Sequence, residues 1–407
     1  MPKSKTIKEK DKKYLWHPFT QMTAWVGGNP LIIKEGKGSY LYDTDGNKYL
    51  DGISSLWVIV HGHRKKELDQ AVKDQLGKVA HTTLLGLGNV PSIELAEQLI
   101  KLMPKGLDKV FYSDSGSTAV EIALKIAFQA SGKKKFITLK NAYHGDTIGS
   151  VSVGGMDLFH KIYKPLLFKA WKVSTDLAEI ERVMIKYHKQ TAAMIVEPLI
   201  QGAAGMLLQP PKFLKNIRHL CRKYGILLIF DEVATGFGRT GKMFAMEHDG
   251  VVPDILCLAK GITGGYLPLA ATITSQEVFD AFGEETFFHG HTYTGNPLAC
   301  AAALANLKIF KKEKTLQKLQ PKIKLLSKRL KEFEKLPQVK EARQCGFMVG
   351  IELKKDNAQQ VILEARKRGA ILRPLGKVIV LMPPLSISKA ELSKLLDITH
   401  HSITSAA

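Results

Sequence analysis

Asp254-Ile-Leu-Cys-Leu-Ala-Lys260-Gly-Ile-Thr-Gly-Gly265 joins a short apolar run to a lysine and a glycine-rich turn. An apolar run bounded by turn residues is typical of a strand buried in a sheet. A lysine at the buried end of a strand is costly to keep charged, because desolvation lowers the pKa of its amine and makes it a nucleophile. Lys260 is therefore either a surface lysine in a turn or an amine that holds an aldehyde cofactor as a Schiff base.

Helices and strands alternate on both sides of this stretch, from about residue 65 to residue 305. Helical periodicity covers 67–79, 92–102 and 118–130, and continuous apolar runs lie at 110–112, 135–139, 193–197, 226–231, 255–259 and 269–273. Strands that are apolar throughout are buried on both faces. The pattern therefore predicts an α/β fold with a mostly parallel central sheet covered by helices.

Both ends of the chain differ from this pattern. Near the N-terminus, strand-like runs at 31–34 and 39–43 precede Asp45-Gly46, which is a hairpin signal. Near the C-terminus, an α+β pattern begins with a long basic helix at 308–335 and continues with strands at 348–353 and 377–382. We therefore predict three parts, which comprise residues 1–60, 61–305 and 306–407.

The net charge of +21, from 59 Lys and Arg against 38 Asp and Glu, raises nucleic-acid binding as a rival function. The lysines are concentrated at 3–13 and 308–335. Apolar residues in the second stretch fall on one helix face, so its lysines would form the solvated face; the apolar residues are Leu316, Leu319, Ile323, Leu326 and Leu330. No DNA- or RNA-binding motif accompanies the lysines, so we expect no nucleic-acid partner.

Four scattered cysteines without a CxxC pair argue against disulfides and favour a reducing compartment. Residues 1–13 lack the apolar core of a secretory signal, and no uninterrupted apolar stretch reaches about 18 residues. We therefore expect a cytoplasmic protein without a membrane partner. The pairs His61-Gly-His63 and His289-Gly-His291 lack a nearby third ligand, so we expect no metal site.

Ser113-Asp-Ser-Gly-Ser117-Thr118 lies between a predicted strand and a predicted helix. Small residues at a helix start leave backbone N–H groups open and add hydroxyl donors, which suits a phosphate. A simple N-cap is the alternative, since serine and aspartate are good caps. Gly236-Phe-Gly-Arg-Thr-Gly241 matches GxGxxG but does not open a helix directly after a strand, so we reject a dinucleotide site there.

Asp231 ends the most apolar strand of the chain, and Lys260 ends another. In an open parallel sheet, ligands bind beyond the carboxyl ends of the strands. The two residues suit a cofactor with a ring nitrogen on one side and an aldehyde on the other, because an aspartate would keep a pyridine nitrogen protonated. A plain salt bridge is the alternative.

Five motifs resemble one family in the same order, over nearly the whole chain. They are Asp114-Ser-Gly-Ser-Thr-Ala-Val-Glu-Ile-Ala-Leu-Lys125, Ala142-Tyr-His-Gly-Asp-Thr147, Glu197-Pro198, Phe230-Asp-Glu-Val-Ala-Thr-Gly-Phe-Gly-Arg-Thr-Gly241 and Thr292-Tyr-Thr-Gly-Asn-Pro297. The family is the class III pyridoxal-phosphate aminotransferases. The resemblance implies a fold-type I transferase with pyridoxal 5'-phosphate as cofactor, a small α+β domain built from both chain ends, and a homodimer with shared active sites.

The resemblance also implies roles for single residues. Lys260 would form the Schiff base, Asp231 would pair with the pyridinium nitrogen, and Tyr143 would lie against the cofactor ring near the substrate. The phosphate would be held by Gly116 and Ser117, and the neighbouring subunit's site would be reached by Gly290, His291 and Thr292, with Thr292 on its phosphate. The substrate would contact Phe19, Leu56, Trp57 and Arg373, with the Arg373 fork on a carboxylate.

Three further stretches resemble the members that aminate 8-amino-7-oxononanoate to 7,8-diaminononanoate in biotin synthesis by ping-pong chemistry. They are Trp16-His-Pro-Phe-Thr-Gln-Met22, Ser54-Ser-Leu-Trp57 and Leu381-Met-Pro-Pro384. Members that use S-adenosylmethionine typically carry other residues at four positions, which here are Phe19, Leu56, His291 and Leu385. We expect S-adenosylmethionine as donor and a pocket wall altered at Phe19, Leu56 and Leu385. The alternatives are lysine as donor, or another class III ω-amino-acid aminotransferase.

Overall fold

A seven-stranded sheet forms the centre of the computed structural model, which describes residues 4–406. Its strand order is β4-β12-β11-β10-β7-β5-β6. Strand β12 pairs antiparallel with β4 and β11, whereas the other pairings are parallel. The strands are β4 (Lys109–Ser113), β5 (Lys135–Leu139), β6 (Trp171–Val173), β7 (Thr191–Val196), β10 (Leu227–Asp231), β11 (Ile255–Leu258) and β12 (Ala270–Thr274). The predicted α/β fold with a mostly parallel sheet is confirmed.

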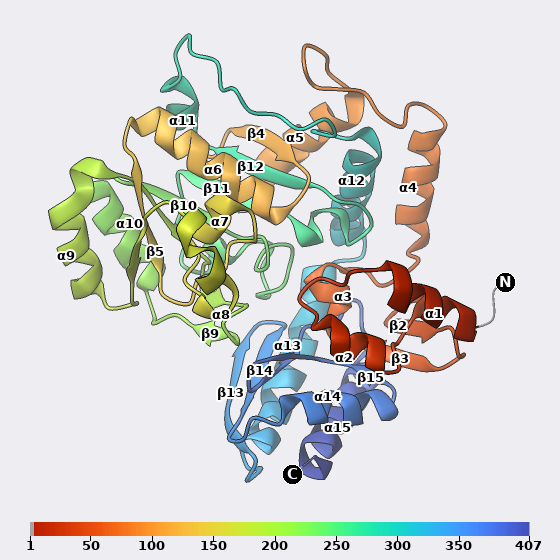
Figure 1. The fold of residues 1–407 in the computed structure, drawn as a ribbon. Coiled ribbons are helices and arrows are strands. Elements are labelled where there is room, and N and C mark those ends of the chain that lie inside the picture. The colour runs from red at the N-terminus through yellow and green to blue at the C-terminus, as the bar shows by residue number, and fades with distance from the viewer. Residues whose placement is uncertain (1–3, 407) are drawn as a thin grey trace.

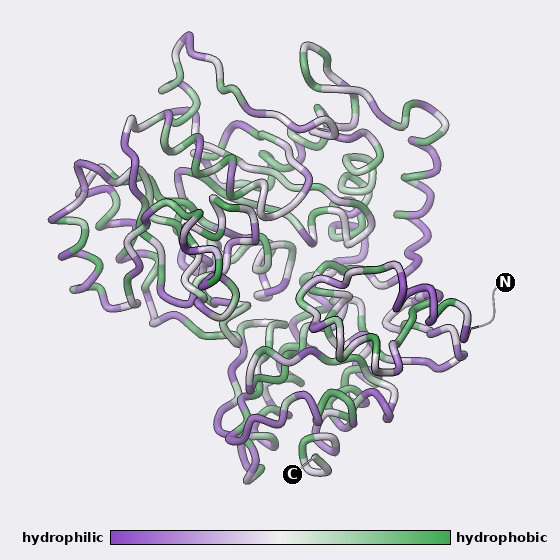
Figure 2. Tube along the Cα trace, viewed as in Figure 1, coloured by the Kyte–Doolittle hydropathy of each residue, from purple (hydrophilic) through white to green (hydrophobic). Residues whose placement is uncertain are grey.

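Both faces of this sheet are buried, as its continuous apolar strands require. In β10, Leu228 and Phe230 belong to the apolar cluster that includes α10 (Phe213–Lys223), and Ile229 belongs to the cluster that includes α6 (Gly116–Ser131). Figure 2 shows the central strands in green and the peripheral helix α4 (Lys66–Leu76) mostly in purple. Helices therefore cover the sheet on both sides (Figure 1).

The helices predicted at 67–79, 92–102 and 118–130 are present as α4, α5 (Val90–Leu102) and α6. The single basic helix predicted at 308–335 is wrong, because Lys314 adopts φ 53° and separates α12 (Pro297–Lys312) from α13 (Thr315–Phe333). The lysines of α13 are also not all solvated. Lys322 is buried, and its Nζ donates to the carbonyl oxygens of Leu385 and Ile387.

The two chain ends meet in one sheet. Strands β1 (Ile33–Lys37), β2 (Tyr40–Asp43) and β3 (Lys48–Asp51) are antiparallel, and β15 (Ala370–Ile371) joins β3 in parallel. The hairpin predicted at Asp45-Gly46 is confirmed, since it connects β2 and β3. Figure 1 shows the red N-terminal and blue C-terminal elements together below the large sheet. The domain boundaries at residues 60 and 305 stay a prediction.

The remaining elements complete this lower part and the loops. A second C-terminal sheet has the order β13-β14-β17-β16. Its strands are β13 (Val339–Cys345), β14 (Met348–Leu353), β16 (Arg373–Leu375) and β17 (Val378–Leu381). The other elements are α1 (Ser4–Tyr14), α2 (Met22–Gly27), α3 (Ser54–Trp57), α7 (Ile148–Ser152), α8 (Asp157–His160), α9 (Leu177–Tyr187), α11 (Gln276–Asp280), α14 (Ala358–Lys367), α15 (Lys389–Ser405), β8 (Ile200–Gln201) and β9 (Leu207–Leu208). Within residues 4–406, no helix is long and apolar enough to cross a membrane.

Candidate active site

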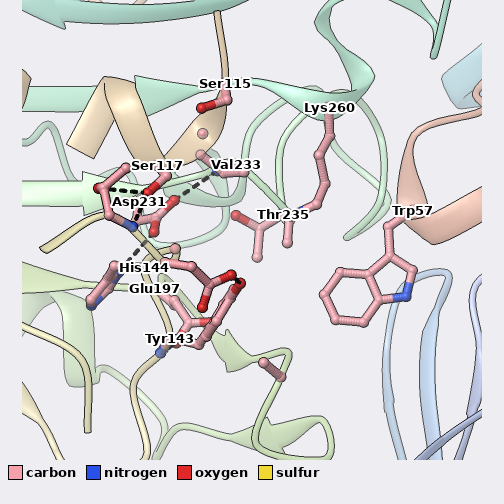
Figure 3. Close-up of a pocket in the computed structure, with 16 residues that line it drawn as sticks. Trp57, Ser115, Ser117, Tyr143, His144, Glu197, Asp231, Val233, Thr235 and Lys260 are labelled. Atoms are coloured by element: carbon pink, nitrogen blue, oxygen red, sulfur yellow. Dashed lines mark hydrogen bonds and ion pairs between the residues drawn. The ribbon is translucent and has the colours of Figure 1, made fainter. Parts of the chain in front are cut away.

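The carboxyl ends of five strands meet at one edge of the large sheet, where a cavity of about 400 Å³ lies. Strands β4, β5, β7, β10 and β11 share one direction, because β12 alone is reversed. The segments that follow these strands line the cavity, and Trp57 joins them from the N-terminal part of the chain. The predicted site residues that the cavity brings together are Trp57, Gly116, Ser117, Tyr143, Asp231 and Lys260. Figure 3 shows the side chains of Trp57, Ser117, Tyr143, Asp231 and Lys260 around a common space.

Lys260 points into this cavity and does not lie on an open turn (Figure 3). It begins a short 3-10 helix directly after β11 and adopts φ 45°. Its Nζ lies 5.3 Å from the centroid of the Trp57 ring. Burial lowers the pKa of Lys260, while the carboxylates of Asp231 and Glu197 oppose that shift. Burial thus makes this amine easier to deprotonate than that of an exposed lysine.

Asp231 forms its ion pair with a histidine. The Oδ2 atom of Asp231 lies 2.7 Å from Nδ1 of His144, and its Oδ1 accepts the backbone N–H of Val233 at 3.0 Å. No ion pair between Asp231 and Lys260 occurs within residues 4–406, so the plain salt bridge between them is absent. Sequence reasoning missed His144, although the motif Ala142–Thr147 contains it. The pair holds a buried carboxylate at the cavity floor.

The start of α6 opens onto the same cavity. Ser115 is the N-cap, and its Oγ accepts the backbone N–H of Thr118. Gly116 and Ser117 follow it in the cavity wall, so the stretch provides both a cap and open N–H groups. A Cβ atom on Gly116 would lie 2.5 Å from Cγ1 of Val233, which explains the glycine. The free N–H groups and the helix dipole make this end suitable for an anion.

Tyr143 lies in the same cavity wall, next to the exposed carboxyl of Asp146 and the cation of Arg373. Its hydroxyl donates to Oδ2 of Asp146 at 2.5 Å, and burial raises its pKa, so the phenol stays protonated. Burial lowers the pKa of Arg373, and the nearby Tyr143 phenol opposes that shift. Arg373 lies in β16, where its backbone pairs with Val380, and no hydrogen bond or ion pair of its guanidinium is found among the described residues. A free guanidinium therefore lies close to the Tyr143 side of the site.

Three residues expected in the pocket wall are not among those that line the Lys260 cavity. Phe19 is 62% exposed and packs edge-to-face on Phe159 with the ring centroids 5.4 Å apart, while Leu56 is 45% exposed. Leu385 is 1% exposed, and its contact with Gly238 places it in the core below the site. The expected wall position of Leu385 is therefore wrong, because the chain turns inward after β17.

The segment expected to act across a subunit interface lies outside the Lys260 cavity. Gly290 and His291 line a separate hollow with α5, and Thr292 is exposed. Nδ1 of His291 lies 2.8 Å from Oδ2 of Asp114, just ahead of the α6 start. The role of this segment in a neighbouring subunit stays a prediction. Among the residues that the structure describes, no group of three or more His, Cys, Asp or Glu side chains could hold a metal ion.

Glu197 predicts a pH dependence of stability. Its carboxyl accepts the backbone N–H groups of Tyr143 and Gly202, each at 3.1 Å, and burial raises its pKa to about 7. The unfolded value is about 4.3. A raised folded pKa gives stability that is complete below the unfolded value and is lost as the pH rises through the folded value.

Between pH 5 and pH 8, this group is therefore expected to lower the free energy of unfolding by about 2 to 3 kcal/mol. Urea unfolding of the cofactor-free chain at a series of pH values measures the slope. Glu197→Gln is expected to show a flatter pH dependence, whatever its absolute stability. Equal pH slopes of the free energy of unfolding for wild type and Glu197→Gln would contradict the attribution of this pH dependence to Glu197.

Comparison with known proteins agrees with this geometry. Residues 22–403 match the family described as aminotransferase class III. The adenosylmethionine-8-amino-7-oxononanoate aminotransferase of Aquifex aeolicus is 52% identical over 97% of this chain and 96% of its own length. The protein of the same name from Staphylococcus aureus is 47% identical, over 96% of each chain.

Solved structures give the same result. The adenosylmethionine-8-amino-7-oxononanoate aminotransferase of Methanocaldococcus jannaschii superposes with a TM-score of 0.97 at 44% identity, covering 98% of this chain and 99% of that one. An (S)-enantioselective ω-transaminase from Thermomicrobium roseum superposes with a TM-score of 0.96 at 33% identity, covering 100% of this chain and 99% of that one. Class III aminotransferases are generally pyridoxal-phosphate dependent. This chain belongs to the class III aminotransferases.

Proposed function

We propose that this chain is a pyridoxal-phosphate-dependent aminotransferase that converts 8-amino-7-oxononanoate to 7,8-diaminononanoate, with S-adenosylmethionine as amino donor. The observation that carries the proposal is the convergence of Lys260, the Asp231–His144 pair and the start of α6 on one cavity. The full-length similarity to proteins named for this reaction supports the choice of acceptor and donor.

The residues present fit pyridoxal phosphate. A cavity of about 400 Å³ is in the size range of small-molecule sites. Gly116 leaves the α6 start open, where the phosphate would bind, and Asp231 would hold the ring nitrogen. Thr235 adds a buried hydroxyl in the cavity wall that has no hydrogen-bond partner among the described residues. A polar ligand would satisfy that group.

Bound pyridoxal phosphate supplies an electron sink for the negative charge that develops on the substrate carbon. Lys260 would hold the cofactor and, once the donor amine has displaced it, take the proton from the substrate carbon and return it one position further on. The lowered pKa of Lys260 favours the free amine that both tasks need. Asp231 would keep the ring nitrogen protonated, and His144 would orient its carboxylate. Reversal of these steps on the keto acid completes the transfer.

Arg373 is proposed to bind the carboxylate of 8-amino-7-oxononanoate. Its guanidinium is partly buried near Tyr143 and has no partner among the described residues, so it offers a planar pair of donors. For Arg373→Met, kcat/KM for the keto acid is expected to fall about 10- to 100-fold, as loss of charge-assisted hydrogen bonds implies. The half-reaction with the amino donor is expected to change less.

Arg368→Met is the matched control, because Arg368 is an exposed arginine at the C-cap of α14 that pairs with Glu364. Steady-state kinetics of both variants with varied keto acid make the comparison. An unchanged kcat/KM in Arg373→Met would exclude this arginine from acceptor binding.

We also propose that the active unit is a cytoplasmic homodimer in which Gly290, His291 and Thr292 complete the partner's site. Their position outside the Lys260 cavity of the same chain supports this proposal. Sedimentation equilibrium of the purified protein tests the dimer. A monomer with full activity would contradict it.

A second candidate is an aminotransferase for another ω-amino acid, and lysine is a second candidate donor. The T. roseum ω-transaminase superposes closely, and Phe19 and Leu56 stand where S-adenosylmethionine users typically carry other residues. The purified holoenzyme is mixed separately with S-adenosylmethionine, lysine and an ω-amino acid, and loss of the cofactor's visible band is followed. Conversion of 8-amino-7-oxononanoate is then measured with each donor. Bleaching by S-adenosylmethionine with turnover supports the proposal, and no turnover with any donor would overturn it.

A further inference from the structure

The turn that carries Trp57 into the cavity has an unusual backbone. Ser54, Ser55, Leu56 and Trp57 adopt φ values of 50°, 46°, 73° and 71°. None of the four is glycine, and left-handed conformations are unfavourable for L-residues with a Cβ atom. A run of four such residues persists only where the surroundings determine it. Something in the fold must therefore hold this turn.

The carboxylate of Asp51, at the end of β3, contacts the turn directly. Its Oδ1 accepts the backbone N–H of Ser55 at 2.9 Å, and its Oδ2 accepts the Ser55 hydroxyl at 2.8 Å. Nε2 of His63 lies 2.9 Å from the same Oδ2. The Asp51 side chain is fully buried, so water does not replace these partners. Asp51 thus joins the turn to a histidine outside it.

His63 is itself held by the hairpin of β1 and β2, in the same sheet as Asp51. Its backbone exchanges hydrogen bonds with Gly38, at 3.0 and 2.8 Å. Its ring packs so closely on Gly36 that a Cβ atom there would lie 2.8 Å from Cγ of His63. On the other side of the turn, the Ser54 hydroxyl donates to the carbonyl oxygen of Met382 at 2.6 Å. The turn is therefore held between the N-terminal hairpin and the residue that follows β17.

The consequence of this arrangement is the position of Trp57. The Trp57 ring is buried, lies 5.3 Å from Nζ of Lys260 and packs 3.4 Å from the position that a Cβ atom on Gly202 would take. Figure 3 shows the indole facing the cavity from the side opposite Asp231. A small change in the turn would move this whole wall relative to the Lys260 amine.

We propose that Asp51 is a positioning residue of the active site: supported by His63, it fixes the left-handed turn Ser54–Trp57 and so holds the Trp57 ring beside Lys260. The inference rests on the proposed function only in taking Lys260 as the amine that holds the cofactor. The placement of Trp57 itself can be measured without cofactor or substrate.

The test uses 5-fluorotryptophan in the full cofactor-free chain, which has four tryptophans, and 19F NMR. Trp57→Phe assigns the Trp57 signal. In Asp51→Asn, the Trp57 signal is expected to shift or broaden while the other three stay in place, because an amide cannot accept from all the Asp51 partners. In the reconstituted enzyme, kcat/KM is expected to fall about 10- to 100-fold, the scale of a misplacement of about 1 Å.

Asp43→Asn is the matched control. Asp43 is another buried carboxylate of the same sheet, and it accepts from Asn47, Tyr49 and the backbone of Asp45, away from the turn. It is expected to lose stability but to keep both the Trp57 signal and kcat/KM. Asp51→Asn is expected to lose stability as well as to move the Trp57 signal, because burial lowers the pKa of Arg239 to about 10 and the Asp51 carboxylate opposes that shift.

Two histidine variants keep the test decisive where Asp51→Asn does not fold. His63→Gln retains a donor toward Asp51 and is expected to keep the Trp57 signal, whereas His63→Ala is expected to move it. An unmoved Trp57 signal in both Asp51→Asn and His63→Ala, or an equal change in Asp43→Asn, would overturn the proposal. Failure of the proposed function is separate, since it would leave the wild-type chain without a visible cofactor band.

Discussion

Lys260→Ala is expected to lose the visible band of the covalently held cofactor and to lower kcat by about 10³-fold or more, because acid–base catalysis by a positioned group contributes about 10²- to 10⁴-fold. The reason lies in the cavity. Lys260 is the amine that points into it beside Trp57, and burial lowers its pKa. An alanine leaves no group there to hold an aldehyde or to move a proton. Absorption spectra and single-turnover kinetics of the reconstituted variant measure both losses.

Lys322→Met is the control for losing a buried lysine. Burial lowers the pKa of Lys322 to about 8, but its Nζ donates to the carbonyl oxygens of Leu385 and Ile387 in the core. This variant is expected to be less stable and to keep its visible band and turnover.

Added small primary amines are expected to restore part of the Lys260→Ala activity, since the cavity keeps room for one. A variant that retains the band without Lys260 would show that another amine holds the cofactor.

The sequence was sufficient to predict which residues converge, because parallel strands bring their carboxyl ends to one edge. Asp231 and Lys260 follow continuous apolar runs, and Ser113–Thr118 follows another, so the rule on strand ends places all three together. The reversed strand β12 does not disturb this, since its two neighbours still point the same way. Local residue patterns therefore predicted the core of the site.

Contacts between distant side chains were beyond the sequence pattern. His144 lies in a quoted motif, but only the loop after β5 shows that its ring meets Asp231 and not solvent. Leu385 was expected near substrate from the residues before it, yet its side chain turns inward to Gly238. Lys322 was predicted on the solvated face of the basic helix, but it is buried and finds carbonyl acceptors in the core. In each case tertiary packing decided the outcome.

Left-handed backbone also escaped prediction. Lys314 broke the predicted basic helix, and Ser54–Trp57 formed a left-handed turn without a single glycine. Sequence rules expect glycine or asparagine at such positions, so residues that adopt them under the constraint of neighbours carry no local signal. The residues of a subunit interface also carry no local signal in the sequence, since the predicted role of Thr292 depends on a second chain.

Asp231→Asn is expected to lower kcat by about 10³-fold, the upper part of the range found when one preorganised electrostatic group is removed. Asparagine keeps the shape and the contact with the Val233 N–H, but it removes the charge that lies 2.7 Å from His144. Without that charge, the cofactor ring nitrogen would lose its proton, and the ring would become a weaker electron sink. Lys260 would still hold the cofactor, so the visible band is expected to remain, with an altered wavelength or pH dependence.

Asp254→Asn is the matched control, because it also removes the charge of a paired aspartate but lies away from the cavity. Asp254 pairs with Arg218 at 2.6 Å and accepts the N–H of Leu228 at 2.7 Å, at the opposite end of the same strands. It is expected to lose stability and to keep kcat. A cofactor analogue methylated on the ring nitrogen carries a fixed positive charge, so it is expected to recover part of the Asp231→Asn activity and none of the Lys260→Ala activity. Equal kcat values for Asp231→Asn and wild type would mean that the aspartate only supports His144, whereas rescue by the fixed charge would tie its effect to the ring nitrogen itself.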